Sequence, residues 1–241
     1  MIRRIVVAAA VLVLTSLAVT PASAQPPSLL FPASCAEIRA ALPIAADGRY
    51  LLRTDSRLVP VYCHDMAGTP REYVTLGSVN FSQYTAGGAA QGTNVRTTFT
   101  RLRIDPETLT VDVNDLTFAT STGTVTQSGS GGTFVITSMA YGVAASCNAA
   151  PSGVGRVDLG GTAFVLDDTF VLGGFMPQGG AIVSPDNRAA DLTGGGYCGA
   201  ITPAPYIFNP TNPSTPDFHL DLACGPYTVA DLLLGRACVD F

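Results

Sequence analysis

The chain has 241 residues, of which 13 are basic and 18 acidic, and none of the basic residues is a lysine. The absence of lysine excludes Schiff-base chemistry and a phosphate-loop lysine, because both need an amine. Two of the arginines, Arg3 and Arg4, lie in the N-terminal segment, so the remaining chain carries eleven arginines against 18 carboxylates, a net charge of about −7. Such an acidic surface is a poor partner for nucleic acid, whose phosphates attract cations.

The N-terminus has the pattern of an export signal. The basic pair precedes the apolar run Ile5–Val19, which ends in the small residues Ala22–Ala24. A membrane helix needs about 20 apolar residues with anchoring flanks, and this run is shorter. We therefore interpret residues 1–24 as a cleaved signal peptide and residues 25–33 as a short leader. The mature chain is expected to be secreted and extracellular, with no membrane anchor.

The cysteines indicate a disulfide framework. Their number is even, they follow an export signal, and none lies in a C-x-x-C pair, so three bridges are favoured over a zinc site. The six are Cys35, Cys63, Cys147, Cys198, Cys224 and Cys238. Sequence alone leaves 15 pairings open.

Two short helices are predicted, one near each end of the mature chain. Ser34 and Glu37 form an S-x-x-E capping box, so a helix is expected from Cys35 to Leu42, closed by Pro43. In the same way, the stretch that begins at Thr228 and contains Asp231 predicts a capped helix that ends at Gly235.

Strand patterns dominate the rest of the chain. Apolar alternation predicts hairpins over residues 50–62 and 101–113, the second continuing through Leu116 and Phe118 after a bulge near Asn114. Further strands are expected at residues 134–143, 156–159, 162–166 and 170–175. Glycine-rich loops are expected at 128–132 and 194–196, and an extended, proline-rich connection at 203–216. The predicted fold is mainly β: an antiparallel β-sandwich or barrel-like domain with a short N-terminal helix, a short C-terminal helix and disulfide bonds.

A series of short motifs resembles the GON domain, a module at the C-terminus of some secreted thrombospondin-repeat metalloproteases and in stand-alone secreted bacterial proteins. The resemblance spans residues 34–201, but tryptophan is missing and a Cys-Gly-x-Cys cluster is reduced to Cys198. The motifs are Cys35, Asp47-Gly48-Arg49-Tyr50, Val61-Tyr62-Cys63-His64-Asp65-Met66, Pro70-Arg71-Glu72-Tyr73-Val74-Thr75-Leu76, Asn80-Phe81-Ser82, Asp105-Pro106 through Leu109, Asp115 to Phe118, Gly142 before Cys147, Asp158-Leu159 with Gly161-Thr162, and Gly195-Gly196-Tyr197-Cys198-Gly199.

The resemblance implies an extracellular module without established chemistry, attached to proteases or standing alone. Zinc-binding or metalloendopeptidase labels of the family would come from the attached protease domain. It also supports pairing Cys35 with Cys63, and we expect the other pairs to be sequential as well, although Cys198 could pair with Cys224 instead of Cys147. Residues 202–241 lie beyond the resemblance and are interpreted as a proline-rich connection and a C-terminal disulfide clasp.

The residues that could carry catalysis have simpler interpretations. An H-E-x-x-H zinc motif is absent, and the chain has only two histidines, His64 and His219. We expect both to be structural, and keep His64 with Asp65 as possible functional residues. No serine lies in a G-x-S-x-G elbow, and an even number of cysteines leaves no free thiol.

Carboxylates leave two alternatives open. A glycosidase needs only two suitably spaced carboxylates, but helix capping explains Glu37, a turn explains Glu107 and a loop between strands explains Glu72, which leaves aspartates. A calcium site is a second alternative, at Asp186, Asn187 and Asp191, although turn chemistry explains these residues better.

The favoured hypothesis is a secreted, non-catalytic binding or adhesion module with no cofactor, whose partner is an unknown extracellular protein or glycan. Candidate contact residues in exposed loops are Tyr84, Tyr206 and Arg53. The alternative is a secreted enzyme of unrecognised mechanism, such as a carboxylate-based hydrolase.

Overall fold

The computed structural model describes residues 31–86, 94–129, 132–205 and 219–240. The helices are α1 (Cys35–Ala41) and α2 (Val229–Leu233). The strands are β1 (Gly48–Arg53), β2 (Arg57–His64), β3 (Arg71–Thr85), β4 (Val95–Asp105), β5 (Thr110–Asp112), β6 (Ala119–Thr122), β7 (Val125–Gly129), β8 (Gly132–Ile136), β9 (Ala144–Ser146), β10 (Gly153–Asp158), β11 (Phe164–Leu166), β12 (Phe170–Gly174), β13 (Gln178–Val183), β14 (Ala189–Gly195), β15 (Gly199–Pro203), β16 (Leu220–Cys224) and β17 (Val239–Asp240). The predicted mainly β, barrel-like fold with two short helices is confirmed.

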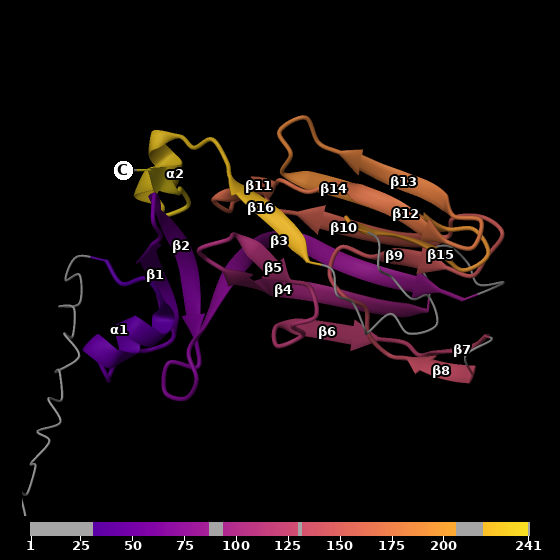
Figure 1. The fold of residues 1–241 in the computed structure, drawn as a ribbon, viewed down its shortest axis with the longest axis horizontal. Coiled ribbons are helices and arrows are strands. Elements are labelled where there is room, and N and C mark those ends of the chain that lie inside the picture. Colours follow the sequence, from indigo (N-terminus) through magenta and orange to yellow (C-terminus); the bar gives the residue numbers. More distant parts are fainter. Residues whose placement is uncertain (1–30, 87–93, 130–131, 206–218, 241) are drawn as a thin grey trace, which may run out of the picture.

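The sheet is organised around β3, which has 15 residues. Its first half pairs antiparallel with β2, and its second half pairs with β10 and, in parallel, with β9. Along β4 the register shifts between Thr75 and Asn80, so the two halves of β3 do not form one regular ladder. The main strand order is β11-β16-β5-β4-β3-β10-β14-β13, and the sheet curls around its own core (Figure 1).

The same register shift decides which side chains enter the core. In β4, Val95, Thr97 and Phe99 are buried, and after Thr100 the alternation changes so that Leu102 and Ile104 are buried. A strand normally buries every second residue, so an extra residue at this point moves its neighbours to the other face. The two arginines beside Leu102 therefore point outward.

Both helices begin at the predicted caps. The Ser34 hydroxyl accepts a hydrogen bond from the Glu37 N–H, and the Glu37 carboxylate accepts one from the Ala33 N–H at 2.8 Å. Glu72, which lies in β3 and not in the expected loop, accepts the Cys35 N–H at 2.8 Å. α1 is therefore attached to the sheet by a carboxylate as well as by a disulfide.

The three disulfides join Cys35 to Cys63, Cys147 to Cys198 and Cys224 to Cys238. These are the sequential pairs that the sequence predicts. The first fixes α1 to the end of β2, the second connects the segment after β9 to the start of β15, and the third encloses α2. At α2, Thr228 and Asp231 form a reciprocal capping box.

Two sequence predictions are wrong near the centre of the chain. The segment 114–118 is not a bulged continuation of a strand but a pair of turns, in which Asp112 accepts the Asn114 N–H and Asp115 accepts the Thr117 N–H. The expected strand 134–143 ends at Ile136. Beyond it, the backbone N–H groups of Met139 and Val143 bind the side-chain hydroxyls of Thr97 and Ser82.

The glycine-rich segments also differ from prediction. Gly194 and Gly195 belong to β14, where they pair with β10 and β13. A Cβ on either would collide with Ala144 or Ser146, which explains why both are glycine. Part of the loop predicted at 128–132 lies in the hairpin of β7 and β8. Pro203 ends β15, and most of the expected proline-rich connection lies outside the described residues.

Candidate functional site

The outer surface of β2, β3 and β4 carries a cluster of aromatic and arginine side chains, which we call the aromatic–arginine face. Cross-strand register places these residues side by side: Tyr62 pairs with Tyr73, Tyr73 with Arg103, and Thr75 with Arg101. Their sequence neighbours Val61, Val74 and Leu102 point into the core. The face consists of Tyr62, His64, Tyr73, Thr75, Arg101, Arg103 and Phe118, the last from the turns that precede β6.

Phe118 is the centre of the aromatic packing. Its ring meets Tyr73 edge-on with centroids 4.8 Å apart, His64 at 4.7 Å and Tyr62 at 6.3 Å. Edge-to-face contacts of this kind contribute about 0.5 to 1.5 kcal/mol each beyond the area that they bury. Tyr73 is consequently only 2% exposed although it lies on the outer face, whereas Phe118 and Tyr62 remain partly accessible.

Arg101 lies over two of these rings. Its Cζ atom is 4.0 Å from the Tyr62 centroid and 4.5 Å from that of Phe118, and its Nε donates to the Thr75 hydroxyl at 3.2 Å. No carboxylate of the described chain lies within ion-pair distance of this guanidinium. The stacking fixes the plane of the guanidinium and leaves N–H groups and positive charge for a ligand.

Arg103 is neutralised, in contrast. Its Nη1 lies 3.4 Å from Asp112 and 3.9 Å from Asp115. Asp115 also accepts a hydrogen bond from the Tyr73 hydroxyl at 3.1 Å. Burial, with a smaller effect of the Asp115 charge, raises the pKa of Tyr73. This phenol therefore stays protonated at neutral pH and serves to hold Asp115.

The possible functional residues His64 and Asp65 border the face and shape the turn from β2 to β3. Asp47 joins them: its Oδ2 lies 2.8 Å from the His64 Nδ1 and accepts the Asp65 N–H, while its Oδ1 accepts the Met66 N–H at 2.8 Å. Asp65 has a φ of 56° and accepts the Thr69 N–H. Asp65 is thus a turn residue, and His64 is held as an aromatic neighbour of Phe118.

Replacing Asp47 with alanine is expected to lower the free energy of unfolding by about 1 kcal/mol at neutral pH, a figure already reduced for the exposure of the carboxylate. Backbone hydrogen bonding, above all from Met66, lowers the pKa of folded Asp47. Its contribution is therefore complete above the unfolded pKa of about 3.9 and disappears as the pH falls through the folded value. Urea unfolding of both proteins at neutral and acidic pH measures this difference. A gap that stays constant down to the lowest pH at which the chain folds would contradict it.

The candidate contact residues Tyr84 and Arg53 do not form a site. Tyr84 is completely buried, and its hydroxyl lies 2.9 Å from the Cys147 sulfur, so its prediction as an exposed ligand contact is wrong. Burial raises its pKa to about 12. Arg53 has an exposed side chain at the end of β1, outside the aromatic–arginine face. Tyr206 lies outside the described residues.

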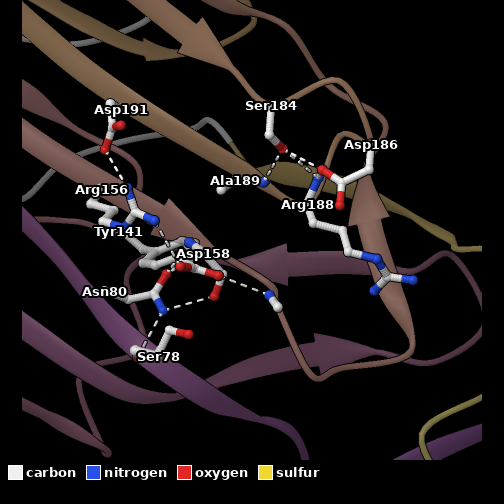
Figure 2. A network of polar contacts seen from close by, with 11 residues as sticks. Ser78, Asn80, Tyr141, Arg156, Asp158, Ser184, Asp186, Arg188, Ala189 and Asp191 are labelled. Atoms are coloured by element: carbon white, nitrogen blue, oxygen red, sulfur yellow. Dashed lines mark hydrogen bonds and ion pairs between the residues drawn. The ribbon is translucent and has the colours of Figure 1, made fainter. Parts of the chain in front are cut away.

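The fold separates Asp186 from Asp191, two of the residues of the alternative calcium site (Figure 2). Asp186 and Asn187 lie in the turn between β13 and β14, where Asp186 accepts from the Ser184 hydroxyl and the Arg188 N–H. These hydrogen bonds lower the pKa of Asp186. Asp191 lies in β14, not in a loop, and forms an ion pair of 2.6 Å with Arg156. Turn chemistry therefore explains Asp186 and Asn187, and a cross-strand ion pair explains Asp191.

Asn80, also shown in Figure 2, is a structural residue at the centre of the sheet. It is completely buried; its Nδ2 donates to the backbone carbonyls of Asp158 and Ser78, and its Oδ1 accepts from the Asp158 N–H and the Tyr141 hydroxyl. Arg156 extends the network by bonding Asp158 at 2.9 Å. Although Asn80-Phe81-Ser82 fits a glycosylation motif, this side chain is inaccessible to a glycan.

A groove of about 710 Å³ adjoins the face and shares Arg103 with it. It is lined by several carboxylates, including Glu72, Asp105, Glu107 and Asp112, and by His219. Most of these groups have structural partners: Glu72 binds the start of α1, Asp105 accepts the Glu107 N–H, and Asp112 pairs with Arg103. His219 lies 3.4 Å from Asp221.

In the part of the chain that the structure covers, no group of three or more histidine, cysteine, aspartate or glutamate side chains is placed to hold a metal ion. The described helices are also too short to cross a bilayer.

Sequence reasoning missed most of the aromatic–arginine face. Tyr62, Tyr73 and Phe118 occur in the motifs that carry the family resemblance, and Arg101 alternates with the core residues of a predicted hairpin. Of these signals, only the alternation gives a direction to a side chain, and it places Arg101 on the outer face of the hairpin. The signals do not show that three strands and a distant turn bring these residues together.

The fold and the face define a disulfide-bonded, β-rich module. The GON domain model matches residues 32–93 and 88–207, and the chain belongs to this family. A similar protein is the human "A disintegrin and metalloproteinase with thrombospondin motifs 20", 26% identical over 204 residues, which covers 70% of this chain and 10% of that protein. The chain therefore spans about a tenth of the length of this relative. No solved structure matches.

Proposed function

We propose that this protein is an extracellular, non-catalytic binding module whose aromatic–arginine face contacts its ligand. The observation that carries the proposal is the position of Arg101, stacked on Tyr62 and Phe118 with no carboxylate partner among the described ion pairs. Exposed aromatic and arginine side chains are the residues that most often dominate binding energies. A guanidinium held in place by two rings also loses little entropy when it binds.

The extracellular location rests on two observations. Three disulfides are typical of proteins in oxidising compartments. The first 24 residues have the composition of a signal peptide, so N-terminal sequencing of the exported protein is expected to begin at Gln25. The metalloproteinase in the relative's name gives no reason to propose proteolysis here, because the match covers 10% of that protein.

The ligand is proposed to be an extracellular protein or a glycan. Partly exposed rings such as Tyr62 and Phe118 can pack on the apolar face of a sugar or on an aliphatic side chain. Arg101 can donate paired hydrogen bonds to a carboxylate or sulfate group beside them. Arg103 contributes contact surface but little net charge, because it pairs with Asp112 and Asp115.

Replacing Arg101 with alanine is expected to weaken ligand binding by about tenfold or more, because it removes the charge, the donors and the cover over both rings. The ligand is first sought by incubating the purified protein with a glycan array and with secreted proteins, and affinities are then compared by calorimetry. The matched control is Arg96→Ala. Arg96 also lies in β4 and stacks on an aromatic ring, 3.5 Å from the Phe81 centroid, but outside the face.

Equal affinities of the wild type and the Arg101→Ala variant would exclude this face as the binding surface. Turnover of a substrate that is abolished by changing His64 or Asp65 in a folded variant would instead favour the enzyme hypothesis.

A further inference from the structure

The strand β13 forms an edge of the described sheet. It pairs with β14 on one side, and no described strand pairs with its other side (Figure 1). Soluble proteins usually protect such an edge with charged residues, prolines or bulges. Pro177 and Pro185 flank β13, but the strand itself contains no proline. Residues 169–185 contain no charged side chain, and Ile182 and Val183 are 77% and 41% exposed.

The hydrogen-bond pattern shows which backbone groups face outward. The Ser184 N–H binds the Ala189 carbonyl, so Ser184 faces β14. Antiparallel strands alternate between bonded and non-bonded positions, so the backbone N–H and C=O groups of Ile182 and Gly180 also point toward β14. Those of Ala181 and Val183 point away from the sheet. Among the described strands, the edge therefore offers a row of backbone donors and acceptors that no other strand pairs.

Gly180 has no evident role in the fold of the single chain. A Cβ atom built on it would meet nothing within 4 Å, and its φ is not in the left-handed region. Gly179, in contrast, has a φ of +118°, and a Cβ on it would collide with the Thr193 carbonyl, so the fold of the single chain requires glycine there. A glycine inside a strand often marks a place where another backbone or side chain approaches closely.

We propose that β13 is a self-association edge, at which two copies of this chain pair antiparallel about a two-fold axis at Ala181. In this register Ala181 exchanges two backbone hydrogen bonds with the same residue of the second copy. Ile182 of each copy lies opposite Gly180 of the other and covers its bare backbone, and Val183 lies opposite Gly179. The absence of charge in the strand means that the two identical edges do not repel each other.

The edge is short, so the dimer is expected to be weak. Stable interfaces bury about 800 Å² per partner, more than a six-residue strand supplies. We expect a dissociation constant on the order of 10 to 100 µM. Sedimentation of the purified chain between about 1 µM and 1 mM is expected to show a monomer–dimer equilibrium.

Three variants test the surface. Ala181→Pro removes an outward N–H without disturbing the pairing with β14, and Ile182→Lys places a charge on the edge; each is expected to weaken association by at least about tenfold. The matched control is Leu233→Lys, which adds the same charge at an 82% exposed leucine in α2 and is expected to leave association unchanged. Circular dichroism shows whether each variant is folded.

The register is tested by charge complementation. Gly180→Asp is expected to fold, because the added side chain enters open space, and to associate weakly by itself. Mixing this variant with Ile182→Lys places the introduced carboxylate of one chain opposite the introduced ammonium group of the other, and is expected to restore association as a heterodimer. A wild-type chain that remains monomeric up to about 1 mM, a dimer unaffected by Ala181→Pro, or a mixture without recovery would each overturn the proposal.

Discussion

Replacing Asn80 with alanine is expected to lower the free energy of unfolding by about 3 to 5 kcal/mol. Asn80 makes four hydrogen bonds in a fully buried position. Its removal would leave the buried Tyr141 hydroxyl and the part-buried Asp158 N–H without this partner. Unsatisfied buried groups cost about 1 to 3 kcal/mol each, which explains the size of the expected effect.

Urea unfolding measures this loss, and Tyr141→Phe provides the matched comparison. That variant removes only one of the four bonds, to a completely buried phenol, and is expected to cost about 1 to 2 kcal/mol. Burial also raises the pKa of Tyr141, so this hydroxyl remains a donor at neutral pH. An Asn80→Ala variant that loses less stability than Tyr141→Phe would show that the network does not hold the sheet.

The helices could be predicted from sequence because their signals are local. Ser34 and Glu37 are three residues apart, as are Thr228 and Asp231, and in both cases the capping bonds form between these pairs. The first hairpin, β1 with β2, is predictable for the same reason: its strands adjoin in sequence and alternate in polarity. The family resemblance adds the Cys35–Cys63 pair, which local pattern alone does not define.

The remaining fold depends on contacts between distant residues. The apolar stretch after Ile136 looks like a strand, but its backbone is bound by the hydroxyls of Thr97 and Ser82, which alternation within the stretch cannot indicate. Tyr84 illustrates a related limit. It is buried because β3 continues through a register shift into the core, and a sequence pattern gives no sign of such a shift.

The candidate site is less predictable than the fold, since it is a property of cross-strand register. Tyr62, Tyr73 and Arg103 form a row only because β2, β3 and β4 pair in one particular alignment. The sequence pattern predicts a strand where a turn supplies Phe118, and a strand would direct this ring elsewhere. The motif residues His64 and Asp65 are neighbours in the chain, but their partner Asp47 lies 17 and 18 positions away.

Complete reduction of the three disulfides is expected to unfold the chain at moderate temperature. The bonded cysteines are 28, 51 and 14 residues apart. Chain-entropy estimates for loops of these lengths give roughly 3 to 4 kcal/mol per bridge. Three such losses total about 9 to 12 kcal/mol, which is comparable with the net stability of about 5 to 15 kcal/mol that is usual for a domain.

The three bridges are also expected to open in a defined order. Cys35 and Cys63 are completely buried, and Cys224 is partly accessible but its partner Cys238 is only 3% exposed, whereas Cys147 and Cys198 are both partly accessible. A mild reductant should therefore open the Cys147–Cys198 bridge first, as seen by alkylation and peptide mapping. Because this bridge closes the longest loop, we expect its replacement by two serines to cost about 4 kcal/mol, more than the loss of Cys224–Cys238, which closes the shortest. A melting temperature that is unchanged after verified opening of Cys147–Cys198 would show that native contacts between the segment after β9 and the start of β15 hold without it.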